Sequence, residues 1–185
     1  YIAYPSCAAD AKGLLKMACR MDDPVIFMEH KGLYRQGYAA TEEPDADYVL
    51  SFGKGKKVLE GDEVTVITWG AMVQKSLEAI QSLEIPNQSV EVIDLRTLNP
   101  LDVDLIKTSI TKTSKALVVH EDNITNGPGA EIAAIIADKF FELLDGPVRR
   151  IGAKDSPVPF NWIIEEEILP QTVDIANAIQ ELLEY

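Results

Sequence analysis

The sequence predicts an α/β fold of three layers (α/β/α) around a mostly parallel sheet. Apolar runs of strand length alternate along the chain with longer segments that carry apolar residues at helical spacing. This alternation is typical of parallel strands joined by right-handed crossovers, with helices on both faces of the sheet. The 185 residues, 46% of them hydrophobic, suit one domain, or one domain with part of another.

The first 35 residues form a unit of their own. Tyr1–Tyr4 has strand character, Ala8–Met21 is expected to be a helix, and Val25–Glu29 is expected to be a second strand. A single βαβ unit cannot bury both faces of its strands, so we expect another segment or domain to cover it. Because the chain begins inside a strand and without methionine, we also expect it to be a fragment.

Residues 36–61 are predicted to be a polar connector. Its basic cluster, Gly53–Lys57, is most simply a solvated turn, and a phosphate-binding role for it is disfavoured.

From Asp62 the alternation becomes regular. Strands are predicted at Val64–Trp69, Val90–Leu95, Lys115–Val119 and Pro147–Ile151. Four helices are predicted between and after these strands. The first has Val73, Leu77 and Ile80 on one face, and the next two span Leu101–Ile110 and Ala130–Phe141. The C-terminal helix has an apolar stripe of Val173, Ala176, Ile179, Leu182 and Leu183.

The net charge of −13 argues against nucleic-acid partners and against anionic membranes, because both would be repelled. No apolar run approaches the length of a transmembrane helix, and no basic-then-apolar leader is found. Cys7 and Cys19 fall on one predicted helix without CxxC spacing, which indicates structural thiols in a reducing compartment.

Gly127-Pro128-Gly129 resembles half of a dinucleotide-binding fingerprint, at the edge of the sheet where such folds bind ligands. The complete pattern needs a third glycine and a tight turn directly after the strand. Here eight residues separate His120 from Gly129, and Pro128 lacks a backbone donor. The pattern therefore favours a helix cap in a longer loop.

His120-Glu121-Asp122 ends the strand that begins at Lys115. Adjacent strand residues point to opposite faces, so these side chains cannot converge on one metal or substrate, and His30 is the only other histidine. We interpret the cluster as a polar boundary between domains or subunits. No serine lies in a Gly-x-Ser-x-Gly elbow, so a hydrolase would lack its nucleophile.

Asp94-Leu95-Arg96 ends another strand, and the turn through Asn99-Pro100 delivers the next helix with Asp102 near its positive end. Taken alone, this pattern predicts an ordered β–α turn.

Several short segments become informative because they occur together and in a fixed order. They are Tyr4-Pro5-Ser6, Asp10–Leu15, Asp23–Phe27, Leu33–Arg35, Gly70–Val73, Ile93–Leu98, His120–Asp122, Gly129–Ile132, Arg149–Gly152, Pro157–Phe160 and Leu169-Pro170. In this order they resemble the β subunit of the thiamine-diphosphate-dependent decarboxylase component of 2-oxo acid dehydrogenase complexes. The resemblance covers essentially the whole chain and is weakest over residues 36–61.

The resemblance implies three parts. Residues 1–35 would be the C-terminal end of the pyrimidine-binding domain, residues 36–61 a linker, and residues 62–185 a transketolase C-terminal-type domain. The family decarboxylates a 2-oxo acid on thiamine diphosphate and Mg²⁺ and passes the acyl group to a lipoyl arm. Its catalytic and cofactor-binding residues lie upstream or in the α part, so the resemblance implies none in this chain, which would act in assembly and be inactive alone.

Two groups of residues are implied by position in the family. Backbone oxygens at Ala18, Met21 and Asp23 match part of a structural K⁺ site. Asp145 and the terminal carboxylate of Tyr185 match the dock for the subunit-binding domain of the acyltransferase core, where a carboxylate pair would meet basic residues.

The implied partners are an α subunit or fused α part, a second β copy in a twofold pair, and the acyltransferase core. The substrate could be pyruvate, a branched-chain 2-oxo acid or acetoin. The bacterial cytoplasm is the expected location, with the mitochondrial matrix as the alternative.

Three other functions stay open. The chain could be the C-terminal part of a transketolase or deoxyxylulose-phosphate synthase, although the contexts of His120–Asp122 and Arg149-Arg150 speak against it. It could instead be a nucleotide- or flavin-binding doubly wound domain, or a pure interaction module.

Overall fold

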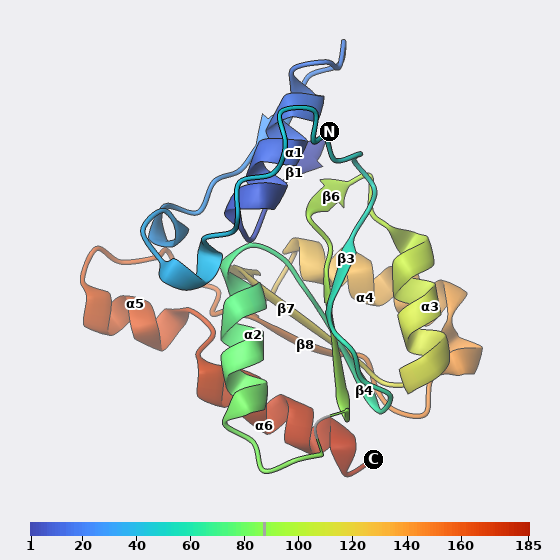
Figure 1. Ribbon diagram of the computed structural model, residues 1–185. Helices are drawn as coiled ribbons and strands as arrows, with labels where there is room; N and C mark the ends of the chain where they lie inside the picture. Colours follow the sequence, from blue (N-terminus) through green and yellow to red (C-terminus); the bar gives the residue numbers. More distant parts are fainter. Residues whose placement is uncertain (87) are drawn as a thin grey trace.

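The computed structural model describes residues 1–86 and 88–185, which form two sheets. Within these residues the larger sheet has five strands in the order β3-β5-β4-β7-β8 (Figure 1). They are β3 (Lys56–Leu59), β4 (Val64–Thr68), β5 (Val90–Asp94), β7 (Ala116–Asn123) and β8 (Arg149–Ala153). Strands β5, β4, β7 and β8 are parallel, and β3 pairs antiparallel with β5 at one edge.

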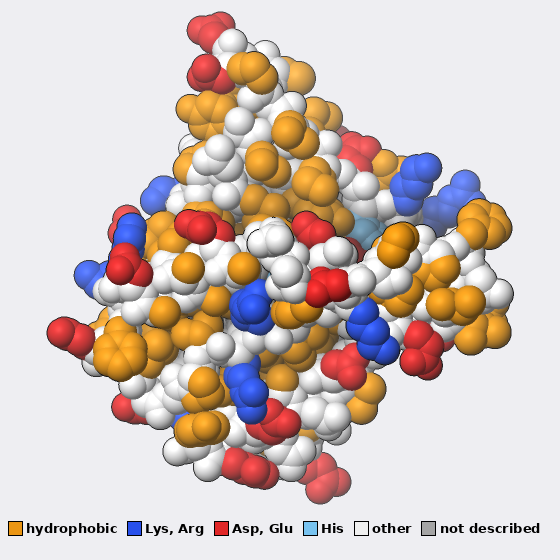
Figure 2. Space-filling model, turned by 180° about the vertical axis from the view of Figure 1, so that it is seen from behind, with side chains coloured by type: hydrophobic (Ala, Val, Ile, Leu, Met, Phe, Trp, Pro, Cys, Tyr) orange, Lys and Arg blue, Asp and Glu red, His pale blue; other side chains and the backbone are white. Residues whose placement is uncertain are grey.

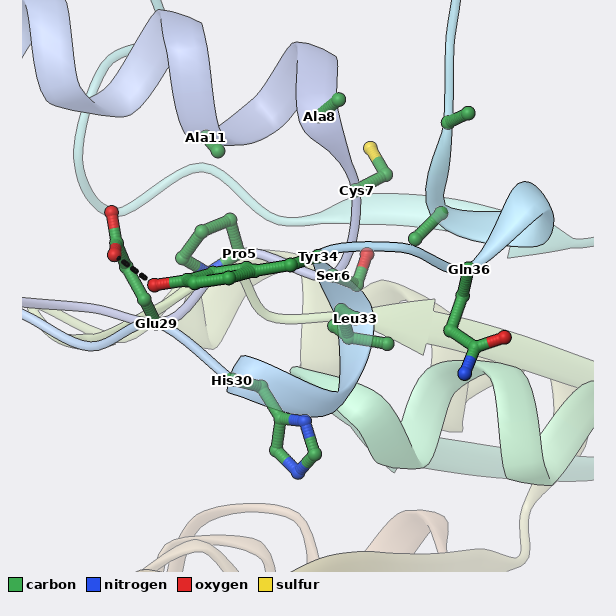
Figure 3. Close-up of a pocket in the computed structure, with 12 residues that line it drawn as sticks. Pro5, Ser6, Cys7, Ala8, Ala11, Glu29, His30, Leu33, Tyr34 and Gln36 are labelled. Carbon is green, nitrogen blue, oxygen red and sulfur yellow. Dashed lines mark hydrogen bonds between the residues drawn. The ribbon is translucent and has the colours of Figure 1, made fainter.

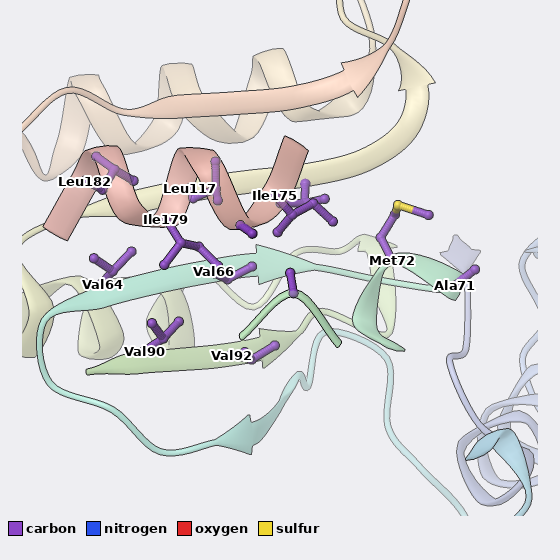
Figure 4. Close-up of a cluster of buried hydrophobic side chains, with 13 residues drawn as sticks. Val64, Val66, Ala71, Met72, Val90, Val92, Leu117, Ile175, Ile179 and Leu182 are labelled. Carbon is purple, nitrogen blue, oxygen red and sulfur yellow. The ribbon is translucent and has the colours of Figure 1, made fainter. Parts of the chain in front are cut away.

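Helices cover both faces of this sheet, as the alternation of the sequence predicts. They are α2 (Ala71–Gln81) and α6 (Thr172–Leu183) on one face, and α3 (Val103–Thr113) and α4 (Pro128–Lys139) on the other. Alternate strand residues serve the two layers: Val64 and Val66 pack with α2 and α6 (Figure 4), whereas Ile67 packs with α3 and α4. The predicted three-layer α/β class with a mostly parallel sheet is confirmed.

The smaller sheet has the strand order β2-β1-β6. Its strands are β1 (Ile2–Ala3), β2 (Ile26–Phe27) and β6 (Thr97–Asn99), and α1 (Ala8–Ala18) connects the first two. Strands β1 and β2 are parallel, so the predicted βαβ unit is present. Strand β6, which belongs to the segment after β5, pairs antiparallel with β1 and extends this sheet at its edge. It does not cover a face of the unit, whose Ile26 side chain stays 60% exposed. What the sequence predicts as a simple β–α turn therefore contains a strand.

Asp102 takes the role expected of an acid at a helix start. Its side chain accepts a hydrogen bond from the Leu105 N–H at 3.0 Å and caps α3. A second oxygen of the same carboxylate accepts from the Gly55 N–H at 3.0 Å. One residue thus stabilises the start of α3 and the segment that leads into β3.

The segment around Gly53–Lys57 differs from the predicted solvated turn, because β3 begins at Lys56. Val58 and Leu59 pack partly buried against the apolar cluster beside α2 and α6. The Lys57 Nζ lies 3.2 Å from the carboxylate of Glu91, which is wholly buried. The sequence did not predict this strand, because its lysines indicated a solvated turn. In the structure the Lys57 side chain pairs with a buried carboxylate, and Val58 and Leu59 pack against the core. The predicted connector also holds the 3₁₀-helix η2 (Gly37–Ala39), after η1 (Lys31–Leu33).

Three further details differ from the sequence-based expectations. Strand β7 continues through His120–Asp122 to Asn123, because β8 pairs alongside it as far as that residue. The stripe on α6 contains Ile175 rather than Val173, which is 60% exposed. The short helices α5 (Trp162–Ile168) and η3 (Phe141–Leu143) were not predicted.

The described residues contain no helix long and apolar enough to cross a membrane. The N-terminal unit keeps apolar side chains at its surface, among them Leu15 at 46% and Ile26 at 60% exposure. Figure 1 shows this unit above the large sheet, away from α6 and the C-terminus.

Candidate functional site

The two sheets meet at the turn between β5 and β6, where an ion pair is buried. Arg96 donates through Nε and Nη2 to the two carboxylate oxygens of Asp10, each at 2.7 Å. Asp10, in the first turn of α1, is 2% exposed and Arg96 is 9% exposed. A bidentate guanidinium–carboxylate pair is strong and fixes orientation. The pair therefore holds α1 in one position against the turn.

Asp94 organises the same turn from inside. One of its oxygens accepts from the Arg96 N–H at 2.9 Å and the other from the Ser6 hydroxyl at 2.5 Å. Arg96 has a positive φ of 58°, which reverses the chain before β6. Burial raises the pKa of Asp94 to about 6, and the two hydrogen bonds act in the opposite direction. We call Ser6, Asp10, Asp94 and Arg96 the latch.

A second polar contact joins the sheets through the end of β7. The His30 Nε2 lies 3.2 Å from the carboxylate of Glu121. This hydrogen bond raises the pKa of His30 above its ordinary value. Burial, reinforced by the Glu121 carboxylate, raises the pKa of Tyr4 to about 12. The phenol therefore stays protonated. Glu121 thus contacts two residues of the N-terminal unit, Tyr4 and His30.

Two pockets flank His30. The first has a volume of about 320 Å³ and lies between the start of α1 and residues 29–40. Figure 3 shows the Tyr34 ring across it, with its hydroxyl bonded to Glu29, and the Cys7 thiol at the edge under α1. Burial raises the pKa of Cys7, so this thiol is not activated.

The second pocket has a volume of about 420 Å³. It lies between the segment that carries His30, the exposed side of α2 and the helix α5. Its wall includes Trp162 and four carboxylates: Glu78, Glu121, Glu165 and Glu166. His30, Leu33 and Gln36 line both pockets.

His120 points away from Glu121, as expected for neighbours on a strand. Its side chain is fully buried and its ring stacks on Trp69, with 5.6 Å between ring centroids and an interplanar angle of 3°. A Cβ at Gly129 would lie 2.3 Å from its Nε2, and one at Gly152 would lie 2.8 Å from its Cε1. Burial lowers the pKa of His120. The glycines therefore make room for a neutral imidazole, and Gly129 serves packing rather than a nucleotide.

The described residues bring together no cluster of side chains that could ligate a metal ion. Among residues 1–86 and 88–185, no group of three or more His, Cys, Asp or Glu side chains could hold a metal ion. His120, Glu121 and Asp122 do not converge, since His120 packs against Trp69 and Glu121 faces His30. The arrangement can join structural units and offer surfaces to partners.

The residues matched to a K⁺ site lie at the end of α1. The Ala18 carbonyl accepts from the Met21 N–H at 3.2 Å, and the Asp23 side chain is exposed. The three residues are thus close in the chain and share one turn region. The K⁺ site stays a prediction.

The residues matched to the acyltransferase dock are brought together. Asp145 is exposed, and its N–H donates to the Ser114 carbonyl at 2.9 Å. A Cβ on the next residue, Gly146, would lie 3.6 Å from Cγ of Tyr185, which is itself 68% exposed. Two parts of the chain 40 positions apart in sequence therefore meet at one surface. Their function as a dock stays a prediction.

The partnership of Asp10 with Arg96 was missed by sequence reasoning. Both residues fall in segments that carry the family resemblance, but they are 86 positions apart. One signal was available: Asp10 stands in a helix among small apolar residues, where an acid needs a buried partner. Nothing local indicated which of the 17 basic residues that partner would be.

Comparison with known proteins agrees with this geometry. The family described as "Transketolase, C-terminal domain" matches residues 53–175, a span that includes β3. The β subunit of the pyruvate dehydrogenase E1 component from Staphylococcus aureus is 41% identical over 184 residues, and that from Staphylococcus epidermidis is 40% identical. Each match covers 100% of this chain and 56% of the relative, so the chain spans little more than half of their length.

A solved structure shows the same architecture. The protein described as "Split gene transketolase, inactive beta4 tetramer" superposes with a TM-score of 0.76 at 26% sequence identity, over 99% of this chain and 57% of that one. The likeness thus extends beyond the large sheet to the N-terminal unit and the latch region. The chain belongs to the transketolase C-terminal domain family, and over its whole length it is similar to β subunits of pyruvate dehydrogenase.

Proposed function

We propose that this chain is the C-terminal part of a 2-oxo acid dehydrogenase decarboxylase, either a separate β subunit or the β part of a fused chain. It would support oxidative decarboxylation of a 2-oxo acid and acyl transfer to lipoamide. The observation that carries the proposal is the 41% identity, which runs through the N-terminal unit and the large sheet alike. A similarity confined to residues 53–175 would have supported only the domain family.

The cofactors of such an enzyme are thiamine diphosphate and Mg²⁺. Thiamine diphosphate, when bound, stabilises the carbanion left by departing CO₂. We propose that residues upstream of this chain and residues of the α part hold both the thiamine diphosphate and the Mg²⁺.

The contribution of this chain's own residues would be to position neighbours. Arg96 and Asp10 fix α1 at distances of 2.7 Å, and β6 completes the sheet that starts with β1. In the proposed enzyme that sheet belongs to the pyrimidine-binding domain. The C-terminal domain would thus hold the edge of the cofactor-binding domain in a defined orientation, and reaction geometry is sensitive to such placement.

A K⁺ ion bound through Ala18, Met21 and Asp23 would strengthen the same unit. Ala18 is the last residue of α1 and Met21 and Asp23 follow it, whereas Asp10 of the latch lies in the first turn of the same helix. We propose that K⁺ and the latch hold the two ends of that helix.

Docking to the acyltransferase core would use Asp145 and the terminal carboxylate of Tyr185. The packing of Tyr185 against Gly146 supports the pairing of these two groups. Calorimetric titration with a subunit-binding domain would test it: Asp145→Ala, and extension of the chain past Tyr185, should each weaken binding, as should salt. Unchanged binding in both variants would refute this dock.

The finer identity of the enzyme is also a proposal. The relatives are named for pyruvate, so we propose pyruvate ahead of branched-chain 2-oxo acids and acetoin. They come from Staphylococcus, so we propose a bacterial cytoplasmic enzyme. A twofold contact between two β copies is part of the same proposal. We also propose that the chain consists of the end of the pyrimidine-binding domain (residues 1–35), a linker (36–61) and the C-terminal domain (62–185). Strand β3 lies in the linker range but pairs with β5, so it belongs to the sheet of the C-terminal domain.

The decisive test is reconstitution of the full-length β polypeptide with its α partner. Release of CO₂ from pyruvate, dependent on both polypeptides and on thiamine diphosphate, is the expected result, and this chain alone should show no turnover. Ketol transfer between sugar phosphates without 2-oxo acid decarboxylation would instead identify a transketolase.

A further inference from the structure

We propose that α5, the residues before it and the adjoining 420 Å³ pocket form a docking surface for a partner segment that presents a lysine or arginine beside apolar side chains. This inference rests on the proposed function, and within that function the α part supplies the segment. Among residues 1–86 and 88–185, no contact buries a side chain of α5.

The first observation is the exposure of five apolar residues that lie close together in the chain, which we call the α5 patch. It consists of Val158, Phe160, Trp162, Ile163 and Ile164, each more than half exposed. Helix α5 buries none of its residues. Figure 1 shows it standing out from the sheet, and from behind it lies in the lobe at the right, where orange side chains gather with charged ones at the margin (Figure 2). Patches of this kind mark interaction sites.

The second observation is that α5 is anchored without its apolar face. Asn161 caps the helix by accepting from the Ile163 N–H at 3.0 Å. The Lys154 N–H donates to the Ile168 carbonyl at 3.0 Å, and the Gln171 side chain donates to the Glu166 carbonyl at 2.8 Å. A seven-residue helix is marginal alone. Here polar contacts hold it in place and leave its apolar side chains free for a partner.

The third observation is the charge of the pocket beside the patch. Within the described part of the chain, Glu78, Glu165 and Glu166 form no ion pair. The one lysine in the wall, Lys75, donates to the Pro170 carbonyl at 2.9 Å. Trp162 adds an aromatic surface to the same wall. Carboxylates beside an indole suit a lysine or arginine side chain.

The carboxylates of this pocket also distinguish between two partners, a second copy of this chain and a different segment. A second copy of this chain in a twofold contact would present the same acidic surface, because such an interface is built from the same patch on both subunits. Like charges brought together at an interface oppose binding, whereas a basic segment gains from them. We therefore assign the surface to a different segment, with apolar side chains on the α5 patch and its cation in the pocket.

The test uses the full-length β polypeptide and the α polypeptide of the same enzyme, with the affinity measured by calorimetry or ultracentrifugation. Trp162→Asp and the double variant Glu165→Lys/Glu166→Lys should each weaken α binding at least ~10-fold, because central aromatic and charged anchors dominate interfaces. Raising the salt concentration should weaken the wild type more than the double variant.

Matched controls lie on the remote 3₁₀-helix η3. Phe141→Asp replaces an apolar side chain that is 72% exposed, and Glu142→Lys reverses an exposed charge, so both should leave α binding within ~2-fold of the wild type. The circular dichroism and melting midpoint of each variant report its folding. If Trp162→Asp fails to fold, the double variant Glu165→Lys/Glu166→Lys carries the test, since Glu166 is exposed and Glu165 is only partly buried.

The possible outcomes separate the two proposals. If the wild type binds α and the α5 variants bind as well as the controls, the docking surface is refuted while the proposed function stands. If the variants lose only self-association of β, the occupant is a second copy and our assignment is wrong. If wild-type β does not bind α at all, the proposed function itself fails, and the docking proposal fails with it.

Discussion

The large sheet and the N-terminal βαβ unit are held together by different forces. The large sheet has strands of four to eight residues between two apolar clusters, and β4 and β5 are buried along their whole length. The N-terminal unit has strands of two residues and keeps part of its apolar surface exposed. Its attachment depends on β6, the latch and the His30–Glu121 contact.

The two regions therefore differ in what fixes their structure: apolar burial stabilises the large sheet, and buried polar contacts orient the N-terminal unit. Apolar burial stabilises the large sheet in proportion to area and tolerates small changes of shape. Buried ion pairs add little net stability but are costly to break on one side, so they select one arrangement. The orientation of the N-terminal unit should therefore depend on very few residues, whereas the large sheet should depend on many.

The largest expected effect comes from removing one partner of the latch. Arg96→Met leaves the Asp10 carboxylate buried and unpaired, which should lower the free energy of unfolding by about 3–5 kcal/mol. Urea denaturation measures the loss, and hydrogen exchange should show that it is concentrated in α1. The double variant Asp10→Asn/Arg96→Met should recover part of the stability. A loss below about 1 kcal/mol in the single variant would show that the latch is not what holds the unit.

A smaller effect is expected inside the large-sheet domain, where close packing rather than charge is disturbed. Gly129→Ala places a methyl group 2.3 Å from the buried His120 ring and should cost about 1–3 kcal/mol by overpacking. Gly146→Ala is the matched control, because its nearest neighbour would lie at 3.6 Å, an ordinary contact. Thermal unfolding compares the two, and equal melting midpoints would contradict the role assigned to the glycines.

The two histidines should respond to pH in opposite directions. His30, whose pKa is raised above 6.5 by its bond to Glu121, contributes stability that is complete below 6.5 and is lost as the pH rises through its raised pKa. His120, whose pKa is lowered by burial, contributes stability that is present above 6.5 and is lost as the pH falls through its lowered pKa. NMR titration of the two imidazole signals measures both values.

The variant His30→Gln assigns the signals, because the chain has only two histidines. It should abolish the resonance with the higher midpoint and leave the lower one in place. A higher midpoint for His120 than for His30 would reverse the comparison between the junction and the domain interior.

The smallest effect is expected from an ion pair on the surface. The Arg149 Nη2 lies 2.8 Å from the Glu181 carboxylate, at side-chain exposures of 47% and 58%. Glu181→Ala should change the free energy of unfolding by at most about 1 kcal/mol, since exposed pairs gain little in water. Denaturation under the conditions used for Arg96→Met places the two pairs on one scale. A loss as large as that of the latch would mean that burial does not set the difference.

Local sequence patterns determined the class of fold and most of its elements. Alternating apolar runs located β4, β5, α2, α3, α4 and α6, because each of these elements has a periodic signature within a few residues. Asp102 was recognised at the start of α3 for the same reason, since a helix cap acts over three residues. The order of short segments also pointed to β subunits of 2-oxo acid dehydrogenases, and the chain is similar over its whole length to β subunits of pyruvate dehydrogenase.

Tertiary structure alone decided how the two sheets are joined. The pairing of β1 with β6, the bond from Arg96 to Asp10 and the contact of His30 with Glu121 link positions about 90 residues apart and leave no periodic trace in either segment. The strand character of Lys56–Leu59 was likewise visible only beside the buried carboxylate of Glu91. Periodicity is a property of neighbours along the chain, whereas the partner of a buried charge or an edge strand is chosen by which surfaces the folded chain brings together.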